Sequence, residues 1–216
     1  MAHHNPGESQ PTVTATLRNE PVQARSTARL TRLLDAAAEV IDEIGFERLT
    51  TAMVAERAGA SIGTVYRYFP DRIAVLQSLS VRATAEFIDE VGATLREESH
   101  TDWLQAVDAA IELLHRSFTS RAGFRSLRFG DVIDLRPAED TRTNSAVVAE
   151  AMAGVLASRF SLDARDLDFH LEAALTIADS LLARSFALGG TGDDRFAATA
   201  KSVARGYLIE QLGRPS

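Results

Sequence analysis

Apolar residues recur at intervals of three and four along most of this chain, which is the spacing of one face of an α-helix. The first clear run follows Arg25 and stops at Gly45, a residue suited to ending a helix. It consists of Leu30, Leu33, Leu34, Ala37, Val40, Ile41 and Ile44. No convincing alternation of apolar and polar residues indicates a strand. The pattern therefore predicts an all-α protein.

Further runs of the same spacing divide the rest of the chain into helices. Two short helices are predicted over 51–58 and 62–69, separated only by Gly59, Ala60 and Ser61. Beyond Pro70 the predicted helices are longer, and they cover 71–95, 101–118, 141–160, 163–188 and 193–212. Residues 123–137 are less regular. About nine helices are expected in total.

Three parts of the chain can be distinguished by their composition. Residues 1–23 contain four Pro and Gly residues among Ser, Thr and Gln, and they show no sustained apolar period, which predicts a flexible tail. Residues 24–70 hold the first helix and the two short ones. Residues 71–216 are expected to form a larger helical domain.

The most informative stretch is 49–72, which reads LTTAMVAERAGASIGTVYRYFPDR. Thr50 or Thr51 can cap the first short helix, and Ser61 can cap the second. Gly59 permits the left-handed backbone of a tight reversal. Two helices joined by a three-residue turn that contains glycine match the DNA-binding helix-turn-helix, whose second helix lies in the major groove.

The second short helix has two chemically different sides. Val65 and Phe69, four residues apart, can pack against the two preceding helices. The side left open carries small residues, hydroxyls and a guanidinium, which suit the approach to a DNA backbone, phosphate binding and the reading of guanine. These residues are Ile62, Gly63, Thr64, Tyr66 and Arg67. Alternatively, Tyr66 and Tyr68 fill a core as Phe69 does, and Arg67 is a solvated charge.

The combination of motifs resembles the TetR family of bacterial repressors over residues 25–80. The first helix ends in IGF and is followed by LTT, AERAGAS, GTVYRYF and a basic residue three positions beyond the Phe. The resemblance implies that Thr51, Tyr66 and Arg72 hold phosphates, that Gly63, Thr64 and Arg67 approach bases, and that Tyr68 is a further phosphate ligand. Ser61 and Ile62 complete the candidate DNA-binding residues.

Two residues depart from the family pattern. Ile62 is apolar where family members often have a polar residue, although an apolar side chain can contact a thymine methyl group. Arg72 replaces the more usual Lys, which keeps the charge but changes the geometry of the contact.

Composition restricts the compartment and the partner. The 216 residues include no cysteine, which removes disulfides, thiolate metal sites and cysteine nucleophiles. No apolar run approaches the ~20 residues of a membrane span, and the polar start does not resemble a signal peptide, so a cytoplasmic protein with no membrane partner is expected.

The net charge of −7 argues against a nucleic-acid partner, but residues 18–72 hold 8 basic and 8 acidic residues. The acidity lies mainly in the C-terminal part.

The C-terminal domain is expected to bind a small-molecule effector between its helices. The candidate ligand-binding residues are Phe87, Trp103, Val107, His115, Phe118, Phe129 and Asp179. Alternatively, the aromatic side chains fill the core and Asp179 is a solvated charge at the edge of an apolar arc. The histidines lack metal-ligand spacing, so no metal and no cofactor is expected.

An apolar stripe near the chain end predicts a homodimer. The candidate dimer-interface residues are Phe196, Val203, Tyr207 and Leu208. The resemblance implies that the last two helices of each subunit form a four-helix interface. Such a dimer would bind a pseudo-palindromic operator in double-stranded DNA.

Three functions are consistent with this sequence. The leading hypothesis is a sequence-specific DNA-binding transcriptional regulator, a repressor released by a small-molecule effector. The alternatives are a helical interaction module with a vestigial helix-turn-helix and an all-helical enzyme. No nucleophile motif, metal spacing or phosphate-binding glycine loop is present, so no catalytic residues are expected.

Overall fold

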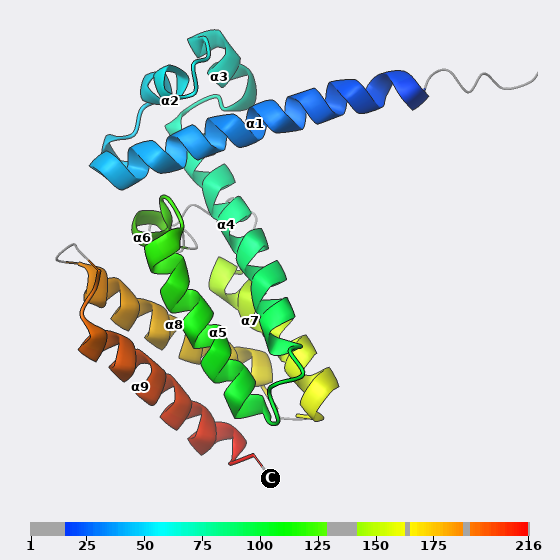
Figure 1. Ribbon diagram of the computed structural model, residues 1–216, viewed down its shortest axis with the longest axis vertical. Helices are drawn as coiled ribbons and strands as arrows, with labels where there is room; N and C mark the ends of the chain where they lie inside the picture. Colours follow the sequence, from blue (N-terminus) through cyan, green and yellow to red (C-terminus); the bar gives the residue numbers. More distant parts are fainter. Residues whose placement is uncertain (1–15, 129–141, 163–164, 188–190, 216) are drawn as a thin grey trace, which may run out of the picture.

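The computed structural model describes residues 16–128, 142–162, 165–187 and 191–215, without the side chains of residues 16–22. All regular structure in these ranges is helical, which confirms the all-α prediction (Figure 1). The elements are α1 (Thr16–Ile44), η1 (Phe46–Arg48), α2 (Thr51–Arg57), α3 (Ile62–Tyr68), α4 (Arg72–Leu95), α5 (Trp103–Ser120), α6 (Phe124–Leu127), α7 (Asn144–Phe160), α8 (Leu167–Phe186) and α9 (Asp194–Leu212).

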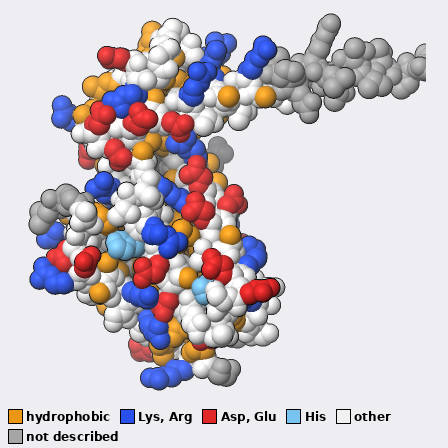
Figure 2. All heavy atoms as spheres, viewed as in Figure 1, with side chains coloured by type: hydrophobic (Ala, Val, Ile, Leu, Met, Phe, Trp, Pro, Cys, Tyr) orange, Lys and Arg blue, Asp and Glu red, His pale blue; other side chains and the backbone are white. Residues whose placement is uncertain are grey.

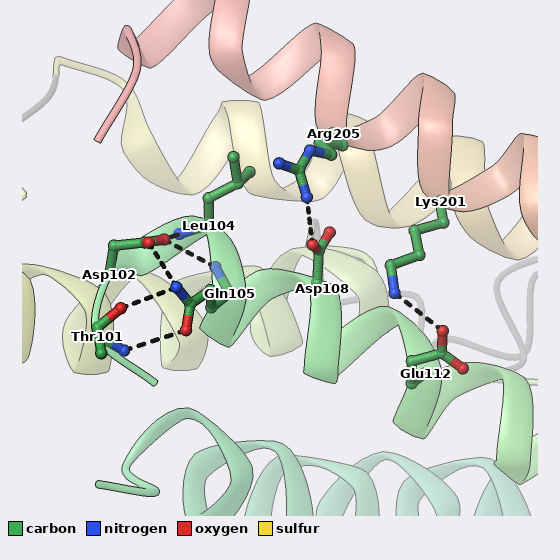
Figure 3. Close-up of polar contacts among 8 residues, drawn as sticks. All are labelled: Thr101, Asp102, Leu104, Gln105, Asp108, Glu112, Lys201 and Arg205. Carbon is green, nitrogen blue, oxygen red and sulfur yellow. Dashed lines mark hydrogen bonds and ion pairs between the residues drawn. The ribbon is translucent and has the colours of Figure 1, made fainter. Parts of the chain in front are cut away.

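Side-chain caps start the helices where the sequence places them. The Thr50 hydroxyl accepts a hydrogen bond of 3.2 Å from a backbone N–H of α2, and the Ser61 hydroxyl accepts one of 3.2 Å in α3. The Asp71 carboxylate accepts a hydrogen bond of 2.8 Å from a backbone N–H of α4. The Asp102 carboxylate accepts two, of 2.9 and 3.0 Å, from backbone N–H groups of α5 (Figure 3). Each cap satisfies N–H groups that the first turn of a helix leaves without a partner.

Helix α1 begins earlier than the sequence pattern indicates. The pattern predicts a flexible tail over residues 1–23 and a helix only beyond Arg25, whereas α1 starts at Thr16. Residues 1–15 lie outside the described residues. The side chains of residues 23–29 are all exposed. Apolar residues recur at helical spacing only where a helix packs against other elements, so the sequence pattern could not reveal the exposed start of α1.

Two hydrophobic cores are joined by the long helix α4. We call α1, η1, α2 and α3 the head, and α5 to α9 the body. The head core is closed by Val75, Leu76 and Leu79 from the first turns of α4, whereas Phe87 and Val91 further along the same helix belong to the body core. A division of the chain at residue 70 therefore separates α4 from a core that it completes.

The short helix α6 connects the body to the head. It lies in the stretch that sequence analysis describes only as less regular. Gly123 precedes it with a φ of 77°, a left-handed backbone that favours glycine, and its N–H donates a 2.8 Å hydrogen bond to Asp42 of α1. Leu127 of α6 is buried within the head core. Helix α6 is thus held by long-range contacts instead of by its own length.

In the body, α8 packs against both α7 and α9, and α5 lies against α4, α8 and α9. Figure 3 shows two ion pairs between α5 and α9: Arg205 with Asp108 at 2.5 Å and Lys201 with Glu112 at 3.0 Å. These pairs fix the side of α9 that faces α5.

Among the described helices, none has both the length and the hydropathy needed to cross a bilayer.

The burial of Phe69 predicts how strongly the head depends on it. Its side chain is 2% exposed, so Phe69→Ala should lower the free energy of unfolding by ~3–5 kcal/mol. The matched control is Ile62→Ala on the same helix, where a 42% exposed side chain should cost much less. Urea denaturation followed by circular dichroism measures both. Equal losses for the two variants would contradict this account of the head core.

Candidate functional site

The reversal between α2 and α3 depends on Gly59. This residue has a φ of 60°. The N–H of Ala60 donates to the Ala55 carbonyl at 2.9 Å, and the N–H of Gly59 donates to the Glu56 carbonyl at 3.1 Å. This pair of bonds is the Schellman motif that ends a helix with a left-handed residue. The reversal is complete within three residues, so α3 begins directly at its Ser61 cap.

Helix α3 presents one side to the head core and the other to solvent. Val65 is fully buried and Phe69, which follows the helix, nearly so, as the sequence predicts. On the opposite side, Ile62 is 42% exposed and Tyr66 53% exposed, and Gly63 and Arg67 are also exposed. A large apolar residue and an aromatic residue are thus open to solvent on a helix of seven residues. This arrangement suits an interface.

The predicted hydroxyl groups lie close together at this surface. The Thr51 hydroxyl at the start of α2 donates to the Tyr66 hydroxyl of α3 at 3.4 Å. The hydroxyls of Ser61 and Thr64 are 2.9 Å apart. The reversal thus brings together the hydroxyls of Thr51 and Tyr66, which are fifteen positions apart in the sequence.

Two predicted DNA ligands have partners within the head. The Tyr68 hydroxyl lies 3.1 Å from the Ser26 hydroxyl of α1, so it attaches α3 to α1. Nη1 of Arg72 donates to the Glu47 carbonyl at 2.7 Å, which ties the start of α4 to η1. A guanidinium has five N–H donors, so this bond leaves others of Arg72 available for a phosphate.

The sequence analysis did not include Arg29 and Arg32 of α1 among the candidate DNA-binding residues. They line a groove together with Ser61 and Thr64 from the reversal and the start of α3. The signal was present in the sequence, because Arg25, Arg29 and Arg32 have the spacing of one helix face.

A small apolar cavity lies within the body. It has a volume of about 20 Å³, which is room for about one water molecule. All of the described residues that line it are apolar, and they come from α4, α5, α7, α8 and α9. They include Phe87, Val107, Leu114, Met152, Leu171 and Leu175. A larger molecule could enter only if these helices moved apart.

Of the predicted ligand-binding residues that the structure describes, Phe87 and Val107 line this cavity and the others do not. Trp103 is buried in the body core away from it, and Phe118 packs between Phe124 and Phe186, with ring centroids 5.4 and 5.6 Å away. The half-buried His115 has its ring 5.9 Å from that of Phe186. These three contribute to packing, which is the alternative that the sequence left open.

Asp179 and Phe129 complete the predicted ligand-binding set. The Asp179 side chain is 15% exposed and pairs with Arg128 at 2.5 Å, so it is neither a solvated charge nor part of the cavity. A charge this deeply placed requires a partner, and the Arg128 guanidinium supplies one. Phe129 lies outside the described residues.

The predicted dimer residues lie on different sides of α9. Val203 is 44% exposed, and Phe196 and Tyr207 are half-buried. The Tyr207 hydroxyl lies 2.9 Å from Nδ1 of His170 on α8. Leu208, in contrast, is fully buried in its own subunit and lines the cavity, so the structure contradicts its place at an interface. The predicted stripe was wider than one face, because α9 packs its inner side on α5 and α8.

A small helical head with an exposed α3, mounted on a larger helical body, defines the class of helix-turn-helix regulators. Comparison with protein families agrees with this class. Residues 33–79 match the family model described as bacterial regulatory proteins, tetR family, and residues 101–212 match the model of the tetracyclin repressor-like C-terminal domain. The chain belongs to the TetR family.

Individual relatives are similar to parts of the chain. The fatty acid metabolism regulator protein of Bacillus subtilis is 28% identical over 105 residues, which cover 49% of this chain and 52% of that protein. The regulator BetI of Cronobacter sakazakii is 35% identical over 68 residues, which cover 32% of this chain and 34% of that protein. The chain thus matches about half or less of the length of these curated relatives.

Solved structures resemble the chain over most of its length. A TetR-family transcriptional regulator from Streptomyces coelicolor is 29% identical, with a TM-score of 0.72, over 85% of this chain and 99% of that one. The fatty acid degradation regulator FadR from Bacillus halodurans shares the fold, with 17% identity and a TM-score of 0.60, over 83% of this chain and 94% of that one.

Proposed function

We propose that this protein is a homodimeric transcriptional repressor that binds operator DNA in the cytoplasm and releases it when an apolar effector enters the body. The observation that carries the proposal is the exposed side of α3. Ile62, Gly63, Tyr66 and Arg67 face solvent while Val65 and Phe69 hold the helix in place. Side chains that protrude from a short, firmly packed helix can reach base edges in a major groove.

Within this interface each residue has a distinct role. Arg67 reads a guanine edge, and Ile62 contacts a thymine methyl group. Gly63 lets the helix approach the duplex, and Thr64 lies beside it near the bases. Thr51 and Tyr66 bind one phosphate through their adjacent hydroxyls, which the 3.4 Å contact between them supports.

Further backbone contacts come from the borders of the interface. Arg72 holds a phosphate with the donors that the η1 carbonyls leave available. The Ser61 cap contributes its backbone and hydroxyl at the start of α3. Tyr68 positions α3 against α1 instead of contacting a phosphate itself. The hydrogen bond between its hydroxyl and that of Ser26 on α1 supports this role.

The dimer forms through the outer sides of α8 and α9. Phe169 of α8 is 60% exposed and Val203 of α9 is 44% exposed. A Cβ added at Gly206 would meet nothing within 4 Å, so this face leaves room for a close approach of two helices. Exposed apolar side chains and small residues on adjacent helices support a two-fold interface between subunits.

The effector is uncharged and mostly apolar, because every side chain around the cavity is apolar and an ionised group there would lose its hydration without gaining a partner. Alkyl compounds are the first to screen, since one relative is named as a regulator of fatty acid metabolism. The enzyme alternative gains no support from this cavity, because the described residues around it carry no titratable side chain.

Arg67 should determine the base preference of the protein. With a duplex that the protein selects from a random library, Arg67→Ala should weaken binding by ~1–3 kcal/mol per half-site and relax the preference at one base position. The control, Tyr66→Phe, removes only a hydroxyl and should weaken all sequences alike, with an unchanged salt dependence. Titrations against single-base variants of the duplex measure both. A uniform loss for Arg67→Ala would contradict its role as a base reader.

Val203 and Leu208 should respond differently to the same substitution. Val203→Asp places a charge on the proposed interface and should give a folded monomer with greatly reduced operator affinity. Leu208→Asp buries an unpaired charge in the body core and should prevent stable folding. Light scattering and circular dichroism distinguish these results. A dimeric Val203→Asp protein with full operator affinity would refute this interface.

Effector binding should oppose operator binding. A compound that raises the thermal unfolding midpoint by entering the cavity must separate the helices around it, and it should weaken operator affinity by ~5- to 150-fold if the coupling has the usual size. The matched control is an ionised compound of similar size, which should leave both the unfolding midpoint and the affinity unchanged. If the apolar compound stabilises the protein without changing operator affinity, release by this cavity is excluded for that compound.

A further inference from the structure

Three arginines form a row on the described N-terminal part of α1. Arg25, Arg29 and Arg32 are spaced by four and three residues, which places them on one face of the helix. All three are exposed, and within the described part of the chain none of them forms an ion pair or a side-chain hydrogen bond. Residues 21–34 contain no Asp or Glu. The row is therefore a local concentration of uncompensated positive charge in an acidic protein.

The arginine row runs beside α3. Arg29 and Arg32 share a groove with Ser61 and Thr64 at the start of α3. At the other end of α3, the bond between Tyr68 and Ser26 holds the turn of α1 that carries Arg25. Figure 2 shows Lys and Arg side chains gathered where the described part of α1 passes α3. The row and the exposed side of α3 can thus face one duplex together.

Acidic residues further along α1 do not cancel this charge. Glu39 and Glu43 lie past the row, where Arg57 of α2 pairs with them at 3.2 and 2.7 Å. Asp35, three positions after Arg32, pairs with Arg82 of α4 at 2.7 Å. The hydrogen bond from Arg57 lowers the pKa of Glu43, so both of these groups stay ionised. The stretch of α1 that holds Arg side chains and no acidic residue is therefore the part beside α3.

The direction of α1 indicates which DNA the row would meet. In Figure 1, α9 lies on the left of the body, and the N-terminal end of α1 extends to the right beyond the head. If the partner subunit docks on α8 and α9, each row lies on the side of its head away from the partner. DNA next to the row would then lie outside the two half-sites.

We propose that Arg25, Arg29 and Arg32 bind backbone phosphates of the DNA that flanks each half-site, as a second contact in addition to the helix-turn-helix. Seven residues of helix span ~10 Å, about the axial length of three phosphates on one strand. Contacts to phosphates add affinity and orientation but no base preference. This inference rests on the proposed function, because it requires the same protein to bind an operator.

The test compares the unmodified protein with a triple variant, R25A/R29A/R32A. Two duplexes carry the selected palindrome, one with ten base pairs of arbitrary sequence on each side and one trimmed at the palindrome ends. On the long duplex, the variant should lower the slope of log affinity against log salt by ~0.9 for each lost phosphate contact, or ~2.7 per subunit. Between 50 and 200 mM salt this difference amounts to roughly 40-fold per subunit. On the trimmed duplex the two proteins should bind alike.

The matched control is R96A/R116A/R165A, which removes three exposed arginines from the body and the C-terminal end of α4 and changes the net charge equally. It should bind the long duplex with the slope of the unmodified protein, and circular dichroism should confirm that both triple variants fold. Equal slopes for the row variant and the control would overturn the inference, as would a loss that persists on the trimmed duplex. An unmodified protein that binds no operator would refute the proposed function as well, whereas binding that does not depend on the flanks refutes only the arginine row.

Discussion

The continuity of α4 is the constraint on which the rest of the structure depends. Its first turns place Val75 and Leu79 in the head core, and its later turns place Phe87 and Val91 in the body core. Because 24 residues of helix are rigid over ~36 Å, neither core can shift along α4 without moving the other. The head has no second long helix shared with the body, so its orientation follows that of α4.

The cavity in the body meets this helix through Phe87. A molecule that separates the helices around the cavity therefore acts directly on the element that carries the head. The bond from Gly123 to Asp42 and the burial of Leu127 in the head core provide a second connection, through α6. Two connections between body and head can transmit a rotation that a single hinge would absorb. In the proposed function, such a rotation would couple effector binding to operator binding by shifting the dimer between two geometries.

Charge is distributed so that an acidic protein can still bind DNA. The formal net charge is −7, but at physiological salt a potential is screened beyond about 8 Å, so only charges near the duplex matter. Three acidic side chains of α1 have ion-pair partners, because Arg57 pairs with Glu39 and Glu43 and Arg82 pairs with Asp35. Arg67 of α3 and Arg25, Arg29 and Arg32 of α1 are exposed. The charge of the proposed DNA-binding surface thus depends on which side chains form ion pairs there, and not on the total charge of the protein.

The sequence by itself determined the helices and the two sides of α3, because spacing, caps and the reversal at Gly59 depend on residues within a few positions of one another. It could not reveal the exposed start of α1, which has no packed face to produce a period, or α6, which is held by contacts with Asp42 and the head core. Tertiary structure also decided that Leu208 faces inward while Val203 faces out, and that Asp179 pairs with Arg128. A local pattern shows that a face is apolar, but the element that covers this face comes from elsewhere in the chain, so only the packed structure identifies it.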